Sequence, residues 1–246
     1  WKGIAAHCGP THVEPFVAAI ASLWAPKDGA RARRDATASA MEVFAGFVRA
    51  SSRWAPDERA RLVSALVPHF SSALRSSAVE SLTDWQLCIR YVAYKRSADE
   101  LGWLTAMLLS LFDEAAREAD ATSLTQANVL RFFNALLTEL GPSGAPLVSR
   151  LLGDARLRHW GMHAARQTRE ELGIFLSISM HALSPTPSPR SAVSKEVGSP
   201  IAAARDAVSA FVAELAALSR PPMLTGGGMA AAAVGDADLE PEEEVV

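Results

Sequence analysis

The sequence predicts an all-α fold in which helical hairpins stack on one another, and three observations lead to this prediction. Apolar residues recur at spacings of three and four along most of the chain, which is typical of helices with one buried face. No strand is predicted, because the chain has no convincing Val- and Ile-rich run of alternating polarity bounded by turn residues. Successive hairpins are expected to begin near Ala36, Val79, Ser123 and about Arg166. Because HEAT and armadillo repeats have a period of roughly 40–47 residues, we expect a HEAT/armadillo-like α-solenoid segment.

Composition limits the function classes. The chain has 246 residues, 49% of them hydrophobic, which is enough for one large domain or two small ones. A net charge of −3 gives no overall attraction to nucleic acid or to an anionic membrane, so no direct nucleic-acid contact is expected. The apolar runs are too short to cross a bilayer, and no signal peptide opens the chain. Cys8 and Cys88 cannot form a disulfide framework, which indicates an intracellular protein. Because the chain starts at Trp1, without an initiator methionine, we expect a piece of a longer protein.

Three helices are expected in the first third of the chain, after an N-terminal stretch (residues 1–10) that glycine and proline interrupt. Their apolar stripes span residues 13–24, 36–50 and 56–74. Pro56 falls in the first turn of the third of these, where its missing N–H costs no hydrogen bond. A small basic cluster precedes the second helix and consists of Arg31, Arg33 and Arg34.

The central hairpin, residues 79–112, has the strongest pattern. The first of its apolar stripes consists of Leu82, Trp85, Ile89 and Val92, and the second consists of Leu101, Leu104, Leu108 and Leu111. A polar break separates the two runs, and within it Ser97 and Glu100 have the spacing of a capping box. Neither apolar face can be buried by its own helix, so the hairpin needs neighbours of its own kind. We expect the structural core to include Trp85, Ile89, Trp103, Leu104, Leu108 and Phe133.

The second half of the chain repeats this design. A helix capped by Ser123 or Thr125 and ending near Leu140 is followed by a short helix over about residues 145–152. Asp154 can cap a longer element that reaches His181 and is interrupted or loosened near Gly161. Gly173 in this element is expected to let a neighbouring helix approach closely.

The predicted domain layout follows. Residues 1–183 form HEAT-like helical repeats, residues 184–199 a Pro/Ser-rich linker, residues 200–219 a further helix of the array, and residues 220–246 a disordered acidic tail. Three residues of the linker region precede proline and are candidates for phosphorylation, namely Ser184, Thr186 and Ser188, although an ordinary spacer is the favoured interpretation.

No catalytic site, metal site or cofactor is predicted. His159 and His163 are four residues apart, but the glutamate of a His-Glu-x-x-His zinc motif is missing, so surface or partly packed histidines are favoured. Cys88 adjoins an apolar stripe, which favours a buried thiol over a nucleophile. Gly226–Gly228 lacks the context of a phosphate-binding loop and is interpreted as flexible tail.

Two charged groups remain as candidates. A solvated face is favoured over a paired-carboxylate site for Asp113, Glu114, Glu118 and Asp120, with Arg117 offsetting part of their charge. The basic cluster Arg31, Arg33 and Arg34 could contact an anionic ligand or an acidic partner surface, or could simply solubilise a loop. If Trp85 and Trp103 were exposed they would be candidates for binding hot spots, but their stripe positions favour the core.

Four motifs in order carry a family resemblance. They are Phe44–Ala50 followed by Trp54-Ala55-Pro56, Glu80–Trp85 followed by Cys88, Trp103-Leu104, and Thr168–Gly173. With them, about residues 13–219 resemble the large HEAT-repeat proteasome activator family (proteasome activator complex subunit 4-like), as a fragment of its C-terminal half. The family's C-terminal hydrophobic–Tyr–any-residue signature, which opens the gate of the core particle, is absent, because this chain ends in Glu244-Val245-Val246.

The resemblance implies a non-enzymatic function. The chain would be a segment of a solenoid that caps the 20S proteasome core particle and promotes degradation of peptides and of unstructured or acetylated proteins. It also implies a nuclear and cytoplasmic location, a partner in the 20S particle through the full-length parent, and acetylated histones as partners of regions outside this chain. A generic HEAT/armadillo adaptor or transport scaffold is the alternative. An all-α enzyme, the third class, would lose turnover on changing His159 or Asp113.

Overall fold

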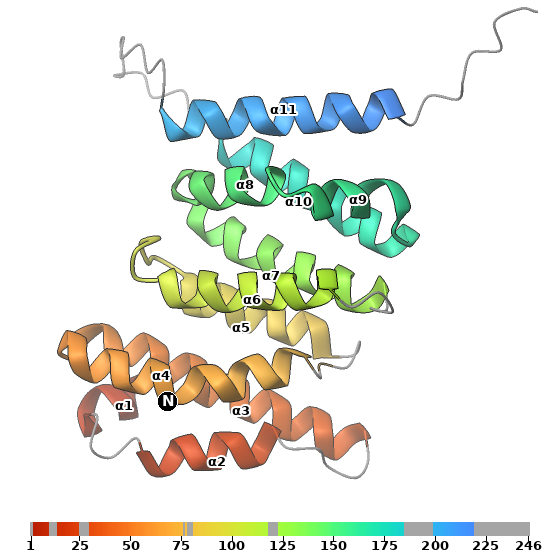
Figure 1. The fold of residues 1–246 in the computed structure, drawn as a ribbon. Helices are drawn as coiled ribbons and strands as arrows, with labels where there is room; N and C mark the ends of the chain where they lie inside the picture. The colour runs from red at the N-terminus through yellow and green to blue at the C-terminus, as the bar shows by residue number, and fades with distance from the viewer. Residues whose placement is uncertain are drawn as a thin grey trace, which may run out of the picture.

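The computed structural model describes residues 2–9, 14–24, 30–75, 77, 81–117, 123–184 and 199–218. These residues form helices joined by turns, and no strand occurs among them, which confirms the predicted all-α fold. The α-helices (Figure 1) are α1 (Lys2–Cys8), α2 (Glu14–Trp24), α3 (Ala30–Ala50), α4 (Pro56–Arg75), α5 (Leu82–Ala93), α6 (Gly102–Arg117), α7 (Ser123–Leu140), α8 (Ala145–Leu152), α9 (Ala155–His163), α10 (Arg166–Ala182) and α11 (Pro200–Leu218).

The helices stack as antiparallel hairpins (Figure 1). In one layer α3, α5, α7 and α10 lie side by side in that order, each packed against the next. In the other layer α4 packs against α6, while α8 and α9 pack against α11, which also contacts α10. At the N-terminal end α2 packs against α3 and α4, and α1 packs against α3. Consecutive hairpins therefore bury each other's apolar faces, as the periodicity predicts.

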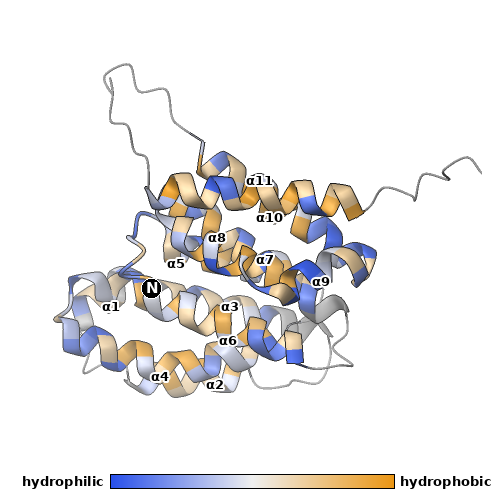
Figure 2. Cartoon of the chain, turned by 45° about the horizontal axis from the view of Figure 1, so that its top comes forward, coloured by the Kyte–Doolittle hydropathy of each residue, from blue (hydrophilic) through white to orange (hydrophobic). Residues whose placement is uncertain are grey.

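Hydrophobic and hydrophilic residues are mixed along the helices, and no labelled helix is uniformly apolar (Figure 2). Within the described ranges, no helix combines the length and the apolar character needed to cross a membrane. The amphipathic pattern instead matches the packing, because the described helices turn most of their apolar residues toward neighbouring helices and their polar residues away from them.

The polar break inside the central hairpin has the predicted capping geometry. The backbone N–H of Ser97 donates to the Glu100 carboxylate at 3.1 Å, and the backbone N–H of Glu100 donates to Ser97 Oγ at 3.3 Å. Lys95, just after α5, has a φ of 56°, a left-handed conformation that side-chain-bearing residues seldom adopt. Together these features end α5 and redirect the chain into α6.

The element expected from Asp154 to His181 is two helices, and the break between them lies shortly after Gly161, near the position predicted for it. The chain breaks at Ala164–Ala165, where both residues have extended backbone, whereas Gly161 lies within α9. A Cβ on Gly161 would lie 2.9 Å from Leu215 Cδ2 of α11, so this glycine permits the close approach of two helices. Gly173, for which we expected that role, has no other helix of the described residues within 4 Å of the position that a Cβ would occupy.

Aromatic rings join α2, α3 and α4 to α5. Phe44 of α3 stacks on Phe70 of α4 with ring centroids 4.2 Å apart, and Trp85 of α5 lies 5.5 Å from Phe70 and 5.6 Å from Trp24 of α2. Offset and tilted aromatic pairs stabilise a core beyond the area that they bury. Of the six residues expected in the core, Trp103 is half-buried, and the others are buried, namely Trp85, Ile89, Leu104, Leu108 and Phe133.

Replacing Trp85 by Ala should lower the free energy of unfolding by about 3–5 kcal/mol, because it would empty a site that is 1% exposed and shared by three helices. Urea unfolding followed by circular dichroism measures the change. Leu87→Ala is the matched control on the same helix, since Leu87 is 55% exposed and its loss should change stability by about 0.5 kcal/mol or less. A loss below about half a kcal/mol for Trp85→Ala would contradict this account of the core.

Candidate interaction surface

The predicted basic cluster lies inside a helix. We expected Arg31, Arg33 and Arg34 to precede a helix starting near Ala36, but α3 already begins at Ala30, so all three lie in its first turns. The side chains of these arginines lie outside the described part of the chain. Positive charge at a helix N-terminus is not favoured by the helix dipole, so local helix stability does not account for the cluster.

The predicted acidic cluster takes part in packing between hairpins. Arg75 of α4 makes two hydrogen bonds of 2.6 Å to the Glu114 carboxylate of α6, and Arg156 of α9 lies 2.7 Å from Asp113. Asp113 and Glu114 are thus paired with arginines from other helices, whereas the sequence suggested a solvated face moderated by Arg117. Glu118 and Asp120 lie outside the described residues.

Neither predicted surface histidine belongs to a multi-residue metal site in the described structure. His159 and His163 are exposed on α9 with ring centroids 4.6 Å apart, and among the described residues no group of three or more His, Cys, Asp or Glu side chains could hold a metal ion. Cys88 is buried on α5, with its Sγ 3.8 Å from the Met41 carbonyl oxygen. Burial raises the pKa of the Cys88 thiol, which keeps it protonated and therefore a weak nucleophile.

Arginine–glutamate pairs bridge two steps of the layer that contains α3, α5, α7 and α10. Arg90 of α5 pairs with Glu139 of α7 at 2.8 Å, and Arg131 of α7 pairs with Glu171 of α10 at 2.5 Å. The second pair is the more buried of the two. Glu171 also accepts hydrogen bonds from Asn134 Nδ2, through its backbone oxygen at 3.2 Å and its carboxylate at 3.4 Å. These partners are about 40 or more residues apart, so no local spacing in the sequence could have indicated them.

The step between α3 and α5 is joined differently, through the C-terminal ends of the two helices. Arg49 of α3 donates to the Tyr91 carbonyl oxygen at 2.6 Å, and Arg96 donates to the Val48 carbonyl oxygen at 2.6 Å. These bonds satisfy carbonyl groups near helix ends, where intrahelical partners run out. The Arg49 guanidinium also lies 4.5 Å from the Tyr91 ring centroid. Arg49 therefore contacts Tyr91 twice, through a hydrogen bond to the carbonyl oxygen and a cation–π contact with the ring.

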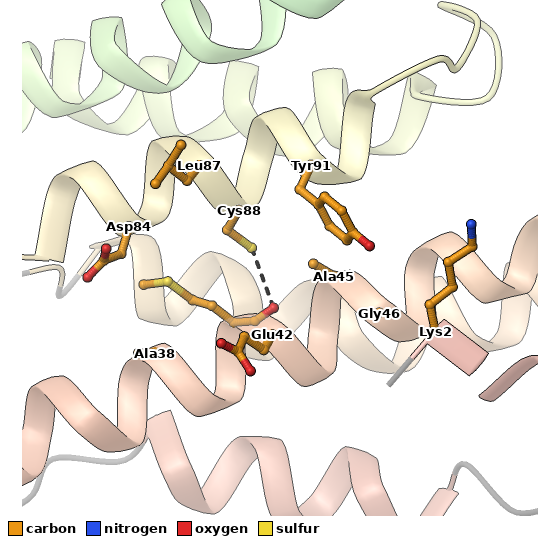
Figure 3. A pocket seen from close by; sticks show the side chains of 10 residues that line it. Lys2, Ala38, Glu42, Ala45, Gly46, Asp84, Leu87, Cys88 and Tyr91 are labelled. Atoms are coloured by element: carbon orange, nitrogen blue, oxygen red, sulfur yellow. Dashed lines mark hydrogen bonds between the residues drawn. The ribbon is translucent and has the colours of Figure 1, made fainter. Parts of the chain in front are cut away.

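Next to these contacts, α3 and α5 border a surface groove of about 420 Å³ (Figure 3). Its α3 side has small residues, Ala38, Ala45 and Gly46, beside Met41, while Leu87, Cys88 and Tyr91 line the α5 side. Glu42 and Asp84 add one carboxylate from each helix. Lys2 lies at the end of the groove opposite Asp84 (Figure 3).

The sequence interpretation missed this groove, although α5 contains a signal for it. Asp84, Leu87, Tyr91 and Tyr94 recur at spacings of three, four and three, which defines a second stripe on the face opposite the buried one. Leu87, Tyr91 and Tyr94 are 55%, 48% and 47% exposed. Large apolar side chains on the exposed face of a helix, in addition to those on its buried face, indicate that the exposed face contacts a partner.

Comparison with known families identifies the part of the chain that contains this groove. Residues 30–134 match the family model described as "Proteasome activator complex subunit 4-like, HEAT repeat-like". The matched residues are therefore similar to a HEAT repeat-like domain of that family. Neither the search of curated proteins nor that of solved structures gives a match. The resemblance predicted from the sequence motifs is therefore confirmed for this range, which runs from α3 into α7.

The proteasome-activator-like domain contains three of the four motifs on which the resemblance was based. The motifs at residues 44–56, 80–88 and 103–104 fall within it, and the motif at residues 168–173 lies beyond its end. The groove between α3 and α5 also lies in this domain apart from Lys2. In contrast, the Arg131–Glu171 pair connects the domain to α10 outside the matched residues.

Replacing Arg131 by Met should lower the free energy of unfolding by about 2–4 kcal/mol, because it leaves the largely buried Glu171 carboxylate without its cation. Removing both charges, in Arg131→Met with Glu171→Met, should restore much of the loss. Arg166→Met tests an exposed pair, Arg166–Glu170, and should cost about 0.5 kcal/mol or less. Urea unfolding of all three variants measures these differences, and a negligible effect of Arg131→Met would refute the proposed contribution of this pair.

Acid should weaken the fold through Glu114 and Asp154. Hydrogen bonds from Arg75 and Arg156 lower the pKa values of these two carboxyl groups. A carboxyl group with a lowered folded-state pKa stabilises the fold above its unfolded pKa of about 4 and loses this contribution as the pH falls through the folded value. We therefore expect the free energy of unfolding to decline from about pH 5 downward.

Arg75→Met should flatten part of this decline, because the pKa of Glu114 then returns toward its ordinary value. Urea unfolding at a series of pH values between about 6 and 2 measures the slope. Arg61→Met is the matched control, since Arg61 is an exposed residue of the same helix that makes no ion pair with the described residues. If Arg75→Met and Arg61→Met gave the same slope, the Arg75–Glu114 contact would not be the source of the acid sensitivity.

Proposed function

We propose that the chain is a non-catalytic segment of a proteasome-activator-like HEAT solenoid. In the full-length parent it would help to cap the 20S core particle and so promote degradation of peptides and of unstructured or acetylated proteins. The observation that carries this proposal is the match of residues 30–134 to the proteasome activator family, located on a stacked array of helical hairpins. Peptide-bond hydrolysis would remain with the core particle.

The arrangement of charged groups supports a scaffold role. Arginines bridge successive hairpins, as Arg75, Arg90 and Arg131 do, so these charged groups define the spacing and register of helices. Interactions of this kind hold stacked repeats in one arrangement, and stacked repeats present extended surfaces to partners. The proposed mechanism is therefore complementarity of shape and surface between the solenoid and the core particle.

The proposal includes the location and the further partners that the family resemblance implies. We propose that the parent acts in the nucleus and the cytoplasm, and that acetylated histones are bound by regions outside this chain. No cofactor is proposed, since the function requires binding and no covalent step.

Affinity purification of the tagged full-length parent from its native cells should recover 20S particles, detected by mass spectrometry. The purified parent should also increase hydrolysis of a fluorogenic peptide by isolated 20S particles. A parent that lacks the segment corresponding to residues 30–134 is the control, and it should lose either binding or stimulation. Recovery of the intact parent without 20S particles would contradict the proposal and favour a generic HEAT adaptor.

A further inference from the structure

The groove between α3 and α5 contains two carboxylates that the packing of the described helices does not use. Glu42 of α3 and Asp84 of α5 line it from facing helices (Figure 3), and neither forms an ion pair with any of the described residues. In contrast, Asp113, Glu114, Glu139 and Glu171 are all paired with arginines of other helices. The two groove carboxylates are therefore available to a cation from outside.

The apolar part of the groove is already arranged for contact. Leu87 and Tyr91, about half exposed, border a surface made of small α3 residues such as Ala45 and Gly46. Arg49 fixes the Tyr91 ring by a cation–π contact at 4.5 Å. A tyrosine whose position is fixed before binding loses little side-chain entropy on contact, which favours affinity.

We propose that this groove binds a short segment of a partner polypeptide that combines apolar and basic side chains. One or two apolar side chains of Leu or Met type would pack against the exposed Leu87 and Tyr91, and a Lys or Arg of the same segment would lie between Glu42 and Asp84. The proposal goes beyond capping of the core particle, because it assigns a defined ligand chemistry to one site and needs no 20S particle.

Charge and size select this occupant over other classes. The two carboxylates repel phosphate groups, which disfavours nucleic acid and anionic lipid as ligands at this end of the groove. A volume of about 420 Å³ lies in the usual range of roughly 300–1,000 Å³ for ligand pockets, so several side chains of a peptide fit. Lys2 lies at the opposite end from Asp84 (Figure 3), and Arg49 lies over the Tyr91 ring, so the acidic part of the groove is the part lined by Glu42 and Asp84.

The test uses the full 246-residue chain and fluorescein-labelled peptides with capped ends. Each peptide has two central leucines, flanked by Arg, by Ser or by Glu. Fluorescence anisotropy at low salt should show the Arg peptide binding roughly five- to tenfold more tightly than the Glu peptide, with the Ser peptide between them. The double substitution Glu42→Lys with Asp84→Lys should reverse this order. Leu87→Ser should weaken all three peptides.

Asp206→Lys on α11 is the matched control, since it reverses an exposed carboxylate far along the chain and should leave the order of the peptides unchanged. Circular dichroism checks that every variant is folded. If the double lysine variant is unfolded, Glu42→Gln with Asp84→Asn replaces it. With these neutral side chains the preference for the Arg peptide should disappear. Three outcomes would overturn the proposal. They are equal binding of the Arg and Glu peptides, no binding of any peptide at millimolar concentration, and dimerisation of the chain that Leu87→Ser abolishes.

Discussion

Each helical hairpin in this chain has an apolar face that only its neighbours can cover. Trp85 shows the consequence, because its ring is buried by Phe70 from α4 and Trp24 from α2, and no residue of its own helix could replace them. Stability in such an array comes from contacts between adjacent hairpins as well as within them. Substitutions at the interface between hairpins should therefore have the largest effect on stability. The charged residues at this interface also affect how the hairpins are arranged.

Arginine pairs add direction to this apolar stacking. Hydrophobic contact alone lets two helices slide past each other, whereas the Arg131–Glu171 pair and the Asn134 hydrogen bonds fit only one register of α7 on α10. A buried ion pair contributes little net stability but strongly disfavours alternative arrangements that would leave its charges unpaired. The reciprocal bonds of Arg49 and Arg96 have the same effect at the α3–α5 step, through backbone carbonyl groups.

Much of the fold could be predicted from the sequence, since helix periodicity and capping are local properties. The pairing of Ser97 with Glu100 needed only a spacing of three residues. What could not be predicted depends on distant parts of the chain. Gly161, and not Gly173, is the glycine at a close helix contact because Leu215 of α11 packs onto it. Likewise, the partners of Asp113 and Glu114 lie about 40 residues away, which made a solvated face the reasonable expectation.

The candidate groove was missed for a related reason, and that reason bears on its function. A helix is expected to have one apolar stripe, whereas α5 has a second one, formed by the exposed side chains of Leu87, Tyr91 and Tyr94. Leu87 and Tyr91 then remain exposed while Arg49 holds the tyrosine ring in place. An exposed apolar side chain that is held in place gives a partner a preformed surface to contact. Glu42 and Asp84 add charges that do not hold the described hairpins together, unlike the paired carboxylates along the rest of the array.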